Sequence, residues 1–258
     1  MTIISLNEQL KNNNLLIGFC LTYPVPGIIE RIGADWDWIW IDAQHGQHDY
    51  NSILGCVRAC ELVGKPSIVR VPSHDYGVIG QALDTCTCGI MVPMINTTEQ
   101  ALEVVRAAKF PPLGSRSYGG RRPIDINGRS YAHSANKDIS LIAQIETEEG
   151  LANVDKIASV PGIDIIFFSP DDMAMQLALP MDQPRNVDIF ESGMKKMAIA
   201  AQKAGKVAGT VTPSPELLEI AIKMGYRLCV GTGDVQLLST GSCKMRDILF
   251  NISSKKGK

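Results

Sequence analysis

Two apolar runs in the second half of the chain, Leu141-Ile-Ala-Gln-Ile-Glu146 and Ile165-Ile-Phe-Phe-Ser-Pro-Asp-Asp172, end in acidic residues. Neither run alternates cleanly between polar and apolar residues, which is typical of parallel strands that are covered on both faces. If the two strands are parallel neighbours, Glu146 and Asp172 meet at one rim of a sheet. Such a pair suits a hard divalent cation, which takes oxygen ligands and leaves positions for water and substrate.

Six more apolar runs of this kind occur along the chain. They span residues 15–21, 38–41, 67–71, 90–94, 207–211 and 227–230. Segments with helical spacing of apolar residues separate the runs, most clearly at 51–63, 98–108 and 215–224. Eight strand–helix units in 258 residues predict an α/β fold, a single (β/α)8 TIM barrel over residues 1–258.

An open, doubly wound sheet is the alternative fold. Such a sheet usually has a glycine-rich phosphate turn after its first strand. The segment Thr22-Tyr-Pro-Val-Pro-Gly27 follows the first run here, and it is not a turn of that kind. The barrel is therefore the favoured prediction.

Two segments stand outside the repeat. Residues 111–138 are rich in Pro, Gly and Arg and contain no long apolar run, which predicts a long loop. Long loops in compact domains are often functional, and a subunit contact or a solvated arm is an equally good interpretation. The polar segment 253–258 is expected to be a frayed tail.

Composition and charge argue against several kinds of partner. The formal net charge is −2 and there is no long basic run, so nucleic acid is not expected to bind. The first residues lack the basic stretch and apolar core of a signal peptide, and no run approaches the roughly 20 apolar residues that span a membrane. Seven cysteines without a repeating frame predict reduced thiols in a cytoplasmic protein.

The active site of a barrel forms where its strands end, and these positions are polar in this chain. They include Asp42, His45, Arg70, Gln144, Glu146, Ser169, Asp171, Asp172, Thr212 and Asp234. Strand ends are polar in many proteins, so each residue alone is weak evidence. Their collection at one predicted face indicates a catalytic site.

Glu146 and Asp172 are the candidate metal ligands, although Asp171 or Asp172 also suits a helix N-cap. Gln144 points to the same side of its strand as Glu146, so it is placed to orient a ligand or a bound water. His45 is the best candidate for a general base, because the reference pKa of histidine lies near neutrality. Arg70 suits a carboxylate or a developing enolate oxygen, and a salt bridge in the barrel mouth is its alternative role.

The lysines argue against one kind of catalysis. A Schiff-base aldolase needs a lysine inside the barrel near the strand ends. Lys65 and Lys206 precede strands, and the other lysines fall in predicted helices, in loops or in the C-terminal tail. Electron withdrawal from a carbonyl substrate would then have to come from a metal.

Several motifs, taken in order, resemble those of the HpcH/HpaI family of metal-dependent, pyruvate-type aldolases. They are residues 35–45 (DWDWIWIDAQH), 69–72 (VRVP), 81–84 (QALD), 89–94 (GIMVPM), 111–116 (PPLGSR), 144–147 (QIET), 169–172 (SPDD) and 230–234 (VGTGD). The resemblance covers nearly the whole chain. It implies a (β/α)8 barrel that forms a homohexamer, a trimer of dimers in which neighbours exchange the last helix.

The same resemblance implies the site. Glu146 and Asp172 would bind Mg²⁺, Mn²⁺ or Co²⁺, and the substrate would be cleaved through a pyruvate enolate held at the metal. His45 would move the proton together with Asp84 from an adjacent subunit, and Asp42 would help to hold His45. The expected substrate contacts come from Arg70, Gln144, Ser169, Asp171 and Thr212.

Three functions are compatible with these residues. The first is a divalent-metal-dependent aldolase, a carbon–carbon lyase that cleaves a 4-hydroxy-2-oxo acid to pyruvate and an aldehyde. The second is an oxaloacetate decarboxylase or an enolate-adding enzyme similar to macrophomate synthase. The third is a non-catalytic oligomeric barrel that binds 2-oxo acids. Ser169 stands where the family usually has glycine, and this departure concerns the second substrate more than the metal site.

Overall fold

The structure, a computed structural model, describes residues 5–11, 14–181 and 187–255. Eight parallel strands pair in sequence order, and β8 pairs with β1, so the sheet closes into a barrel. The strands are β1 (Leu16–Leu21), β2 (Trp38–Asp42), β3 (Ser67–Arg70), β4 (Gly89–Val92), β5 (Ser140–Ile145), β6 (Ile165–Phe168), β7 (Val207–Val211) and β8 (Leu228–Gly233). The predicted (β/α)8 barrel is confirmed, and each strand lies within three residues of its predicted bounds.

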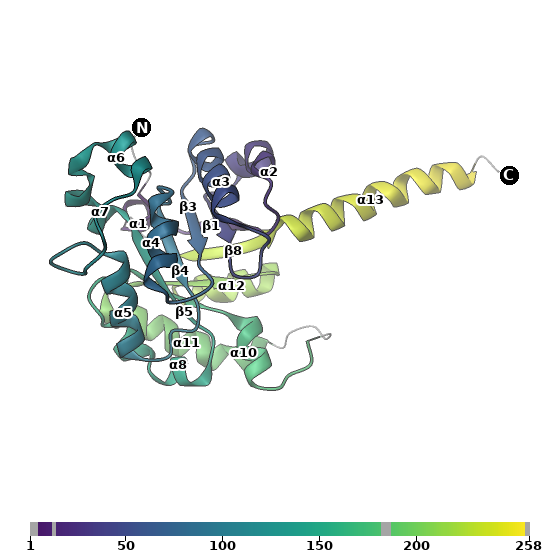
Figure 1. The fold of residues 1–258 in the computed structure, drawn as a ribbon. Coiled ribbons are helices and arrows are strands. Elements are labelled where there is room, and N and C mark those ends of the chain that lie inside the picture. Colours follow the sequence, from purple (N-terminus) through teal and green to yellow (C-terminus); the bar gives the residue numbers. More distant parts are fainter. Residues whose placement is uncertain (1–4, 12–13, 182–186, 256–258) are drawn as a thin grey trace.

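Helices connect the strands, and most of the helices form an outer layer around the barrel (Figure 1). They are α1 (Leu6–Lys11), α2 (Pro26–Ile32), α3 (Tyr50–Leu62), α4 (Tyr76–Asp84), α5 (Thr98–Ala108), α6 (Arg121–Asn127), α7 (Ala132–Asp138), α8 (Glu148–Ala152), α9 (Val154–Ala158), α10 (Pro170–Gln176), α11 (Val187–Ala204), α12 (Pro215–Lys223) and α13 (Asp234–Lys255). Two 3-10 helices, η1 (Gly33–Asp35) and η2 (Arg129–Tyr131), extend this layer. Side-chain caps fix the starts of several helices, as where Asp49 and Ser52 form a capping box at α3.

The barrel interior is a packed apolar core. It is filled by Leu16, Trp38, Trp40, Ile68, Met91, Ile142, Ile165, Phe167, Leu228 and Val230. Helix α1 closes the amino end of the barrel, because Leu6 and Leu10 are buried against this same cluster. A second, larger cluster fills the layer between the strands and the surrounding helices. The barrel is therefore sealed at one end, and only the carboxyl ends of the strands are available for a site.

The segment 111–138, predicted to be a long loop, contains α6, η2 and α7. These helices are short and bury few side chains each, so they leave no long apolar run in the sequence. Tyr131 is central to their packing: its ring stacks on Tyr118 at 5.8 Å between centroids, and its hydroxyl donates to the Gly119 carbonyl oxygen at 2.8 Å. The segment predicted as a loop therefore contains short helices, and an aromatic cluster with local hydrogen bonds packs among them.

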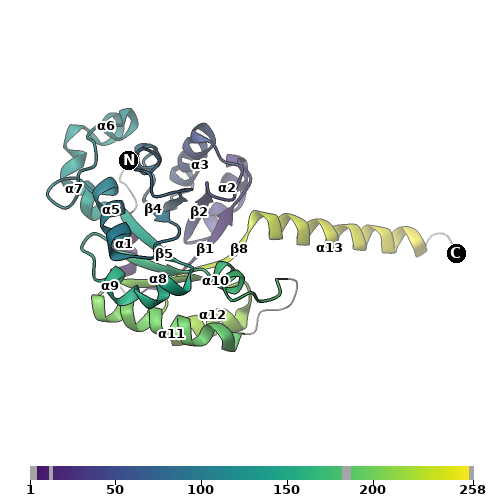
Figure 2. The same cartoon turned by 60° about the horizontal axis from the view of Figure 1, so that its bottom comes forward.

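The last helix, α13, leaves the barrel and projects away from it in both views (Figures 1 and 2). Its contacts with the rest of the chain are made near its start, against β1 and β8. Apolar side chains along it are largely exposed, namely Leu238, Met245, Ile248, Leu249 and Ile252. Their spacing places them along one face of the helix. Residues 253–255, predicted as part of a frayed tail, belong to α13, and 256–258 lie outside the described residues.

None of the helices in the described ranges is both long enough and apolar enough to cross a membrane.

Candidate active site

Strand alternation carries the polar residues into the mouth of the barrel. Ile142 belongs to the interior core, so Gln144 and Glu146, two and four residues later, face the same way. Phe167 likewise places Ser169 inward, and Trp40 places Asp42 inward. The candidates therefore form a polar layer above the apolar interior. Gln144, Glu146 and Ser169 are all buried there.

The two candidate metal ligands meet, as predicted from their positions. Glu146 follows β5 and Asp172 lies in the first turn of α10, near enough for the charge of Asp172 to act on Glu146. Burial, together with the nearby charge of Asp172, raises the pKa of Glu146 to about 7. Without a cation, the pair therefore retains a proton up to nearly neutral pH.

Each carboxylate is held by a neighbouring group. Gln144 Nε2 donates to Glu146 Oε2 at 2.6 Å, and the Met94 backbone N–H donates to Glu146 Oε1 at 2.7 Å. Ser169 Oγ donates to Asp172 Oδ2 at 2.7 Å. Gln144 and Ser169, predicted to contact substrate, thus orient the acidic pair in this structure. The Gln144 Oε1 atom is buried without a hydrogen-bond partner.

Arg70 is fixed from two sides. Its Nε and Nη2 atoms donate to the two oxygens of Asp42 at 2.8 and 2.7 Å, because Asp42 and Arg70 are register partners on β2 and β3. The guanidinium carbon lies 4.5 Å from the centre of the Trp40 ring. Burial alone would raise the pKa of Asp42, but the hydrogen bonds and charge of Arg70 outweigh it and hold that pKa below its usual value.

His45 lies in the loop between β2 and α3, and it is exposed at the barrel mouth. Asp42, predicted to hold His45, accepts the His45 backbone N–H at 3.4 Å, whereas its main partner is Arg70. Asp42 therefore contacts the backbone of the loop that carries the imidazole. Its side chain bonds to Arg70, because the strand register places Asp42 beside Arg70 on β3.

Asp84 lies away from the other candidates of its own chain. It is the last residue of α4, five residues before β4 begins at Gly89, so it lies toward the amino end of the barrel. Its Oδ1 accepts a hydrogen bond from Arg116 Nη2 at 3.0 Å. Any contact between Asp84 and His45 therefore requires a second copy of the chain.

The remaining two candidates, Thr212 and Asp171, differ in their exposure to solvent. Thr212 is buried after β7, and its hydroxyl donates to the Val230 carbonyl oxygen at 3.3 Å. Asp171 is exposed in the first turn of α10. Of the two, Asp171 is the one open to solvent.

Lys109 is buried, so its position is compared with the one that a Schiff-base nucleophile would need. Its Nζ donates to the carbonyl oxygens of Asn136 and Ile139 and to Asp164 Oδ2 at 3.0, 2.6 and 3.0 Å. Asp164 precedes β6, so the lysine lies at the amino end of the barrel, away from the mouth. Burial lowers the pKa of Lys109, but its position makes it structural.

A divalent cation fits the acidic pair. In the parts of the chain that the structure describes, no group of three or more His, Cys, Asp or Glu side chains is arranged to hold a metal. Glu146 and Asp172 would therefore be the protein ligands, and water and substrate oxygens would fill the other positions, as Mg²⁺ allows. The unpartnered Gln144 Oε1 supplies an acceptor for a bound water.

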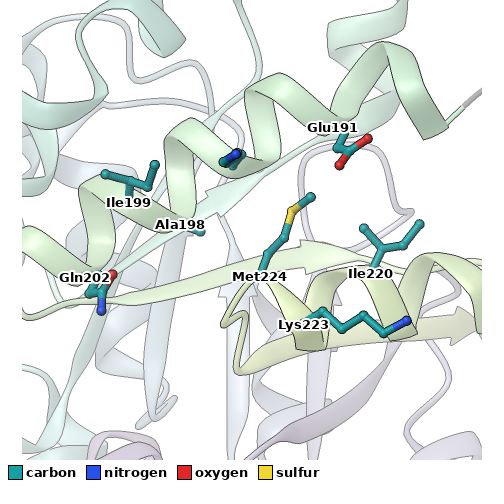
Figure 3. A pocket seen from close by; sticks show the side chains of 8 residues that line it. Glu191, Ala198, Ile199, Gln202, Ile220, Lys223 and Met224 are labelled. Atoms are coloured by element: carbon teal, nitrogen blue, oxygen red, sulfur yellow. The ribbon is translucent and has the colours of Figure 1, made fainter.

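The grooves on the outer surface carry none of this chemistry. The groove between α11 and α12, shown in Figure 3, has a volume of about 440 Å³. It is lined by Glu191, Lys195, Ala198, Ile199, Gln202, Ile220, Lys223 and Met224. None of these is a candidate residue, so the barrel mouth remains the candidate active site.

The sequence prediction missed two contributors to the site, the Trp40 ring beneath Arg70 and the Met94 N–H that binds Glu146. Asp234 was in the predicted polar set, but its contact with the turn after β1 was not predicted. Trp40 could have been found from alternation, since it lies two residues before Asp42. The Met94 contact depends on how two loops meet, and the sequence carries no signal for it.

The chain is an enzyme of the carbon–carbon lyase class built on a (β/α)8 barrel. The assignment to this class rests on similarity to known proteins. Residues 27–239 match the HpcH/HpaI aldolase/citrate lyase family, and the chain belongs to that family.

Two relatives show the extent of the similarity. The chain is 40% identical over 226 residues to a 4-hydroxy-2-oxovalerate aldolase of Novosphingobium aromaticivorans, which covers 86% of both chains. It is 31% identical over 252 residues to a 2-dehydro-3,6-dideoxy-6-sulfogluconate aldolase of Pseudomonas putida, which covers 96% of both chains. Both relatives are named as aldolases, and their names give different substrates.

Two solved structures share the fold over almost the whole chain. An HpcH/HpaI aldolase/citrate lyase family protein from Burkholderia cenocepacia J2315 superposes with a TM-score of 0.86 at 28% identity, covering 95% of this chain and 98% of that one. Macrophomate synthase superposes with a TM-score of 0.83 at 26% identity, covering 96% and 91%. The barrel is thus shared by proteins with different named activities.

The raised pKa of Glu146 predicts how stability depends on pH. The folded protein without metal binds a proton at Glu146 up to about pH 7, whereas an ordinary glutamate releases it near 4.5. This proton therefore stabilises the folded state fully below about pH 4.5, and the contribution is lost as pH rises to about 7.

Urea unfolding in EDTA at several pH values measures this effect. We expect the free energy of unfolding of wild type, taken relative to Glu146→Gln, to fall between pH 5 and pH 8. A difference that stays constant over this range would contradict the assigned shift.

Proposed function

We propose that this enzyme is a divalent-metal-dependent aldolase that cleaves a 4-hydroxy-2-oxo acid to pyruvate and an aldehyde. The observation that carries the proposal is the buried Glu146 with half-buried Asp172 near enough to raise its pKa, beside Arg70 in a barrel of this family. A cation held by the pair, Mg²⁺, Mn²⁺ or Co²⁺, would withdraw electrons from the carbonyl of the 2-oxo acid. The aldolase names of the two relatives support this substrate class.

The residues of the chain divide the remaining work. His45, in the exposed loop after β2, takes the proton of the C4 hydroxyl as the C3–C4 bond breaks and the aldehyde leaves. The electron pair of that bond moves into the three-carbon fragment, and Arg70 faces the oxygen on which negative charge develops. A proton from water then adds to C3 and gives pyruvate, and His45 releases its proton to solvent. Because Asp42 and Trp40 fix the guanidinium of Arg70, this donor is oriented before substrate binds.

Assembly is part of the proposal. Asp84 lies toward the amino end of its own barrel, so a pairing with His45 needs a neighbouring subunit. The exposed apolar face of α13 favours burial against another copy, since large exposed apolar surfaces are rare on monomers. We propose a homohexamer, a trimer of dimers in which α13 packs on a neighbour. A cytoplasmic location remains a prediction.

A second function has a specific observation in its favour. The similarity to macrophomate synthase favours an enzyme that decarboxylates oxaloacetate or adds the resulting enolate to an acceptor. A comparison of oxaloacetate with 4-hydroxy-2-oxo acids as substrates separates the two reactions. Faster turnover of oxaloacetate at matched concentrations would favour the second. A non-catalytic binding barrel has less support, because the relatives are enzymes.

Metal removal tests the proposed function. Purified protein is treated with EDTA and supplied with 4-hydroxy-2-oxo acids of different chain length, and pyruvate is measured with lactate dehydrogenase and NADH. We expect pyruvate release to fall to background and to return when Mg²⁺, Mn²⁺ or Co²⁺ is added in excess of EDTA. Release that persists after dialysis against EDTA would overturn the metal-dependent mechanism.

A further inference from the structure

The loop that carries His45 is tied to the first residue of α13. Asp234 begins this helix and is only 1% exposed. Its carboxylate accepts the backbone N–H of Thr22 at 3.0 Å and of Tyr23 at 2.8 Å, one on each oxygen. It also accepts the N–H of Val235 at 2.9 Å. A buried carboxylate with three backbone donors fixes the turn after β1 firmly, because each bond involves a charged acceptor.

The turn after β1 also holds the loop between β2 and α3. The Thr22 carbonyl oxygen accepts the Gln47 N–H at 3.0 Å. The Leu21 carbonyl oxygen faces His48 Nε2 at 3.1 Å, so this nitrogen must carry the hydrogen, since a carbonyl only accepts. Burial lowers the pKa of His48, which favours the neutral ring. Two bonds therefore fix the far side of the loop.

The loop packs closely against the turn at Gly46. A Cβ at Gly46 would overlap the Asp42 carbonyl oxygen and come within 2.8 Å of the Thr22 carbonyl oxygen. On its near side, Asp42 Oδ1 accepts the Gln44 N–H at 3.1 Å and the His45 N–H at 3.4 Å. His45 is thus held between Asp42 and the turn after β1.

We propose that Asp234 is a positioning residue for His45, acting through the turn at residues 22–23 and the loop at residues 43–48. The inference rests on the proposed function, in which His45 moves the proton. Arg70, Glu146 and Asp172 come from β3, the end of β5 and α10, whereas the hydrogen bonds of Asp234 go to the turn after β1 and to Val235. Loss of the Asp234 contacts therefore affects proton transfer and leaves ligand binding intact.

The test is Asp234→Asn, which replaces one acceptor oxygen with an NH₂ group that faces a backbone N–H. We expect kcat to fall about 10- to 100-fold, the size of effect that a small misplacement of a catalytic group produces. KM and the affinity for Mn²⁺ should stay within about twofold of wild type. Hydrogen exchange should be faster at the Gln47 amide and unchanged in α5.

Asp75→Asn is the matched control. Asp75 is also a capping aspartate, but its Oδ1 alone accepts both the Gly77 and Val78 N–H groups, so asparagine keeps these bonds. We expect its kcat, KM and exchange rates to match wild type. Gly46→Ala is the second test variant, because it displaces the same loop from within, and it decides the question if Asp234→Asn does not fold.

The possible outcomes separate this inference from the proposed function. A kcat within twofold of wild type in Asp234→Asn, with His45→Ala inactive, would overturn the positioning role alone. A loss of Mn²⁺ affinity as large as the loss of kcat would also overturn it, since Asp234 would then support the whole site. If wild type releases no pyruvate, the proposed function fails, and unchanged exchange at Gln47 would still overturn the structural link.

Discussion

Replacing Glu146 with glutamine is expected to lower kcat/KM for pyruvate release by about three orders of magnitude, because several kcal/mol of charge stabilisation by a cation would be lost. Glutamine keeps the size of the side chain and can still accept the Met94 N–H, while its NH₂ group can donate to Gln144 Oε1 once that amide turns over. It removes the negative charge that a hard cation requires. Titration calorimetry with Mn²⁺ should show weaker binding by the variant in parallel with its lower activity.

Glu148→Gln provides the control for this experiment. Glu148 lies two residues further on, is exposed and begins α8, so the same change there alters net charge without touching the acidic pair. We expect its activity and Mn²⁺ affinity to match wild type. Full activity in Glu146→Gln would show that the metal, if one is needed, binds elsewhere.

Placing a charge on the exposed face of α13 is expected to break the assembly. Leu249 is 57% exposed, and in the proposed hexamer it would be buried against a neighbour. Burial of a leucine contributes about 1.5 to 3 kcal/mol, and burial of an unpaired glutamate is unfavourable. Leu249→Glu should therefore weaken the contact by about two orders of magnitude or more.

Light scattering after size exclusion measures this effect directly. Wild type should have a mass about six times the 28.0 kDa of one chain, and Leu249→Glu should have a smaller one. Thr240→Glu is the control, because residue 240 lies on the opposite side of the helix from residue 249. A wild-type protein of 28.0 kDa, or a Leu249→Glu variant of unchanged mass, would refute this mode of assembly.

The fold was largely predictable because each parallel strand is buried on both faces and therefore appears as a continuous apolar run. The runs at 38–41 and 207–211 correspond to β2 and β7 almost residue for residue. The segment 111–138 was less predictable, since α6 and α7 are short and are held by contacts with Tyr118 and Tyr131 rather than by a periodic apolar face.

The placement of the candidate residues at one end of the barrel was predictable, and their contacts were less so. Strand ends identified Glu146, Asp172 and Arg70, because the carboxyl ends of parallel strands must lie together. The partners of these residues depend on register across strands, as between Asp42 and Arg70, or on loops that meet only in the folded chain. Asp234 stood at a strand end, but its contact with a turn 212 residues away has no local signal in the sequence.

The seal that α1 makes at the amino end of the barrel has a kinetic consequence. Leu6 and Leu10 close that end, so everything that enters or leaves must pass through the carboxyl mouth. In the proposed reaction the 2-oxo acid part of the substrate is held deepest, against the buried Glu146, and the aldehyde part lies toward solvent. The two products would then depart in a fixed order, the aldehyde before pyruvate. In the synthetic direction pyruvate would have to arrive first.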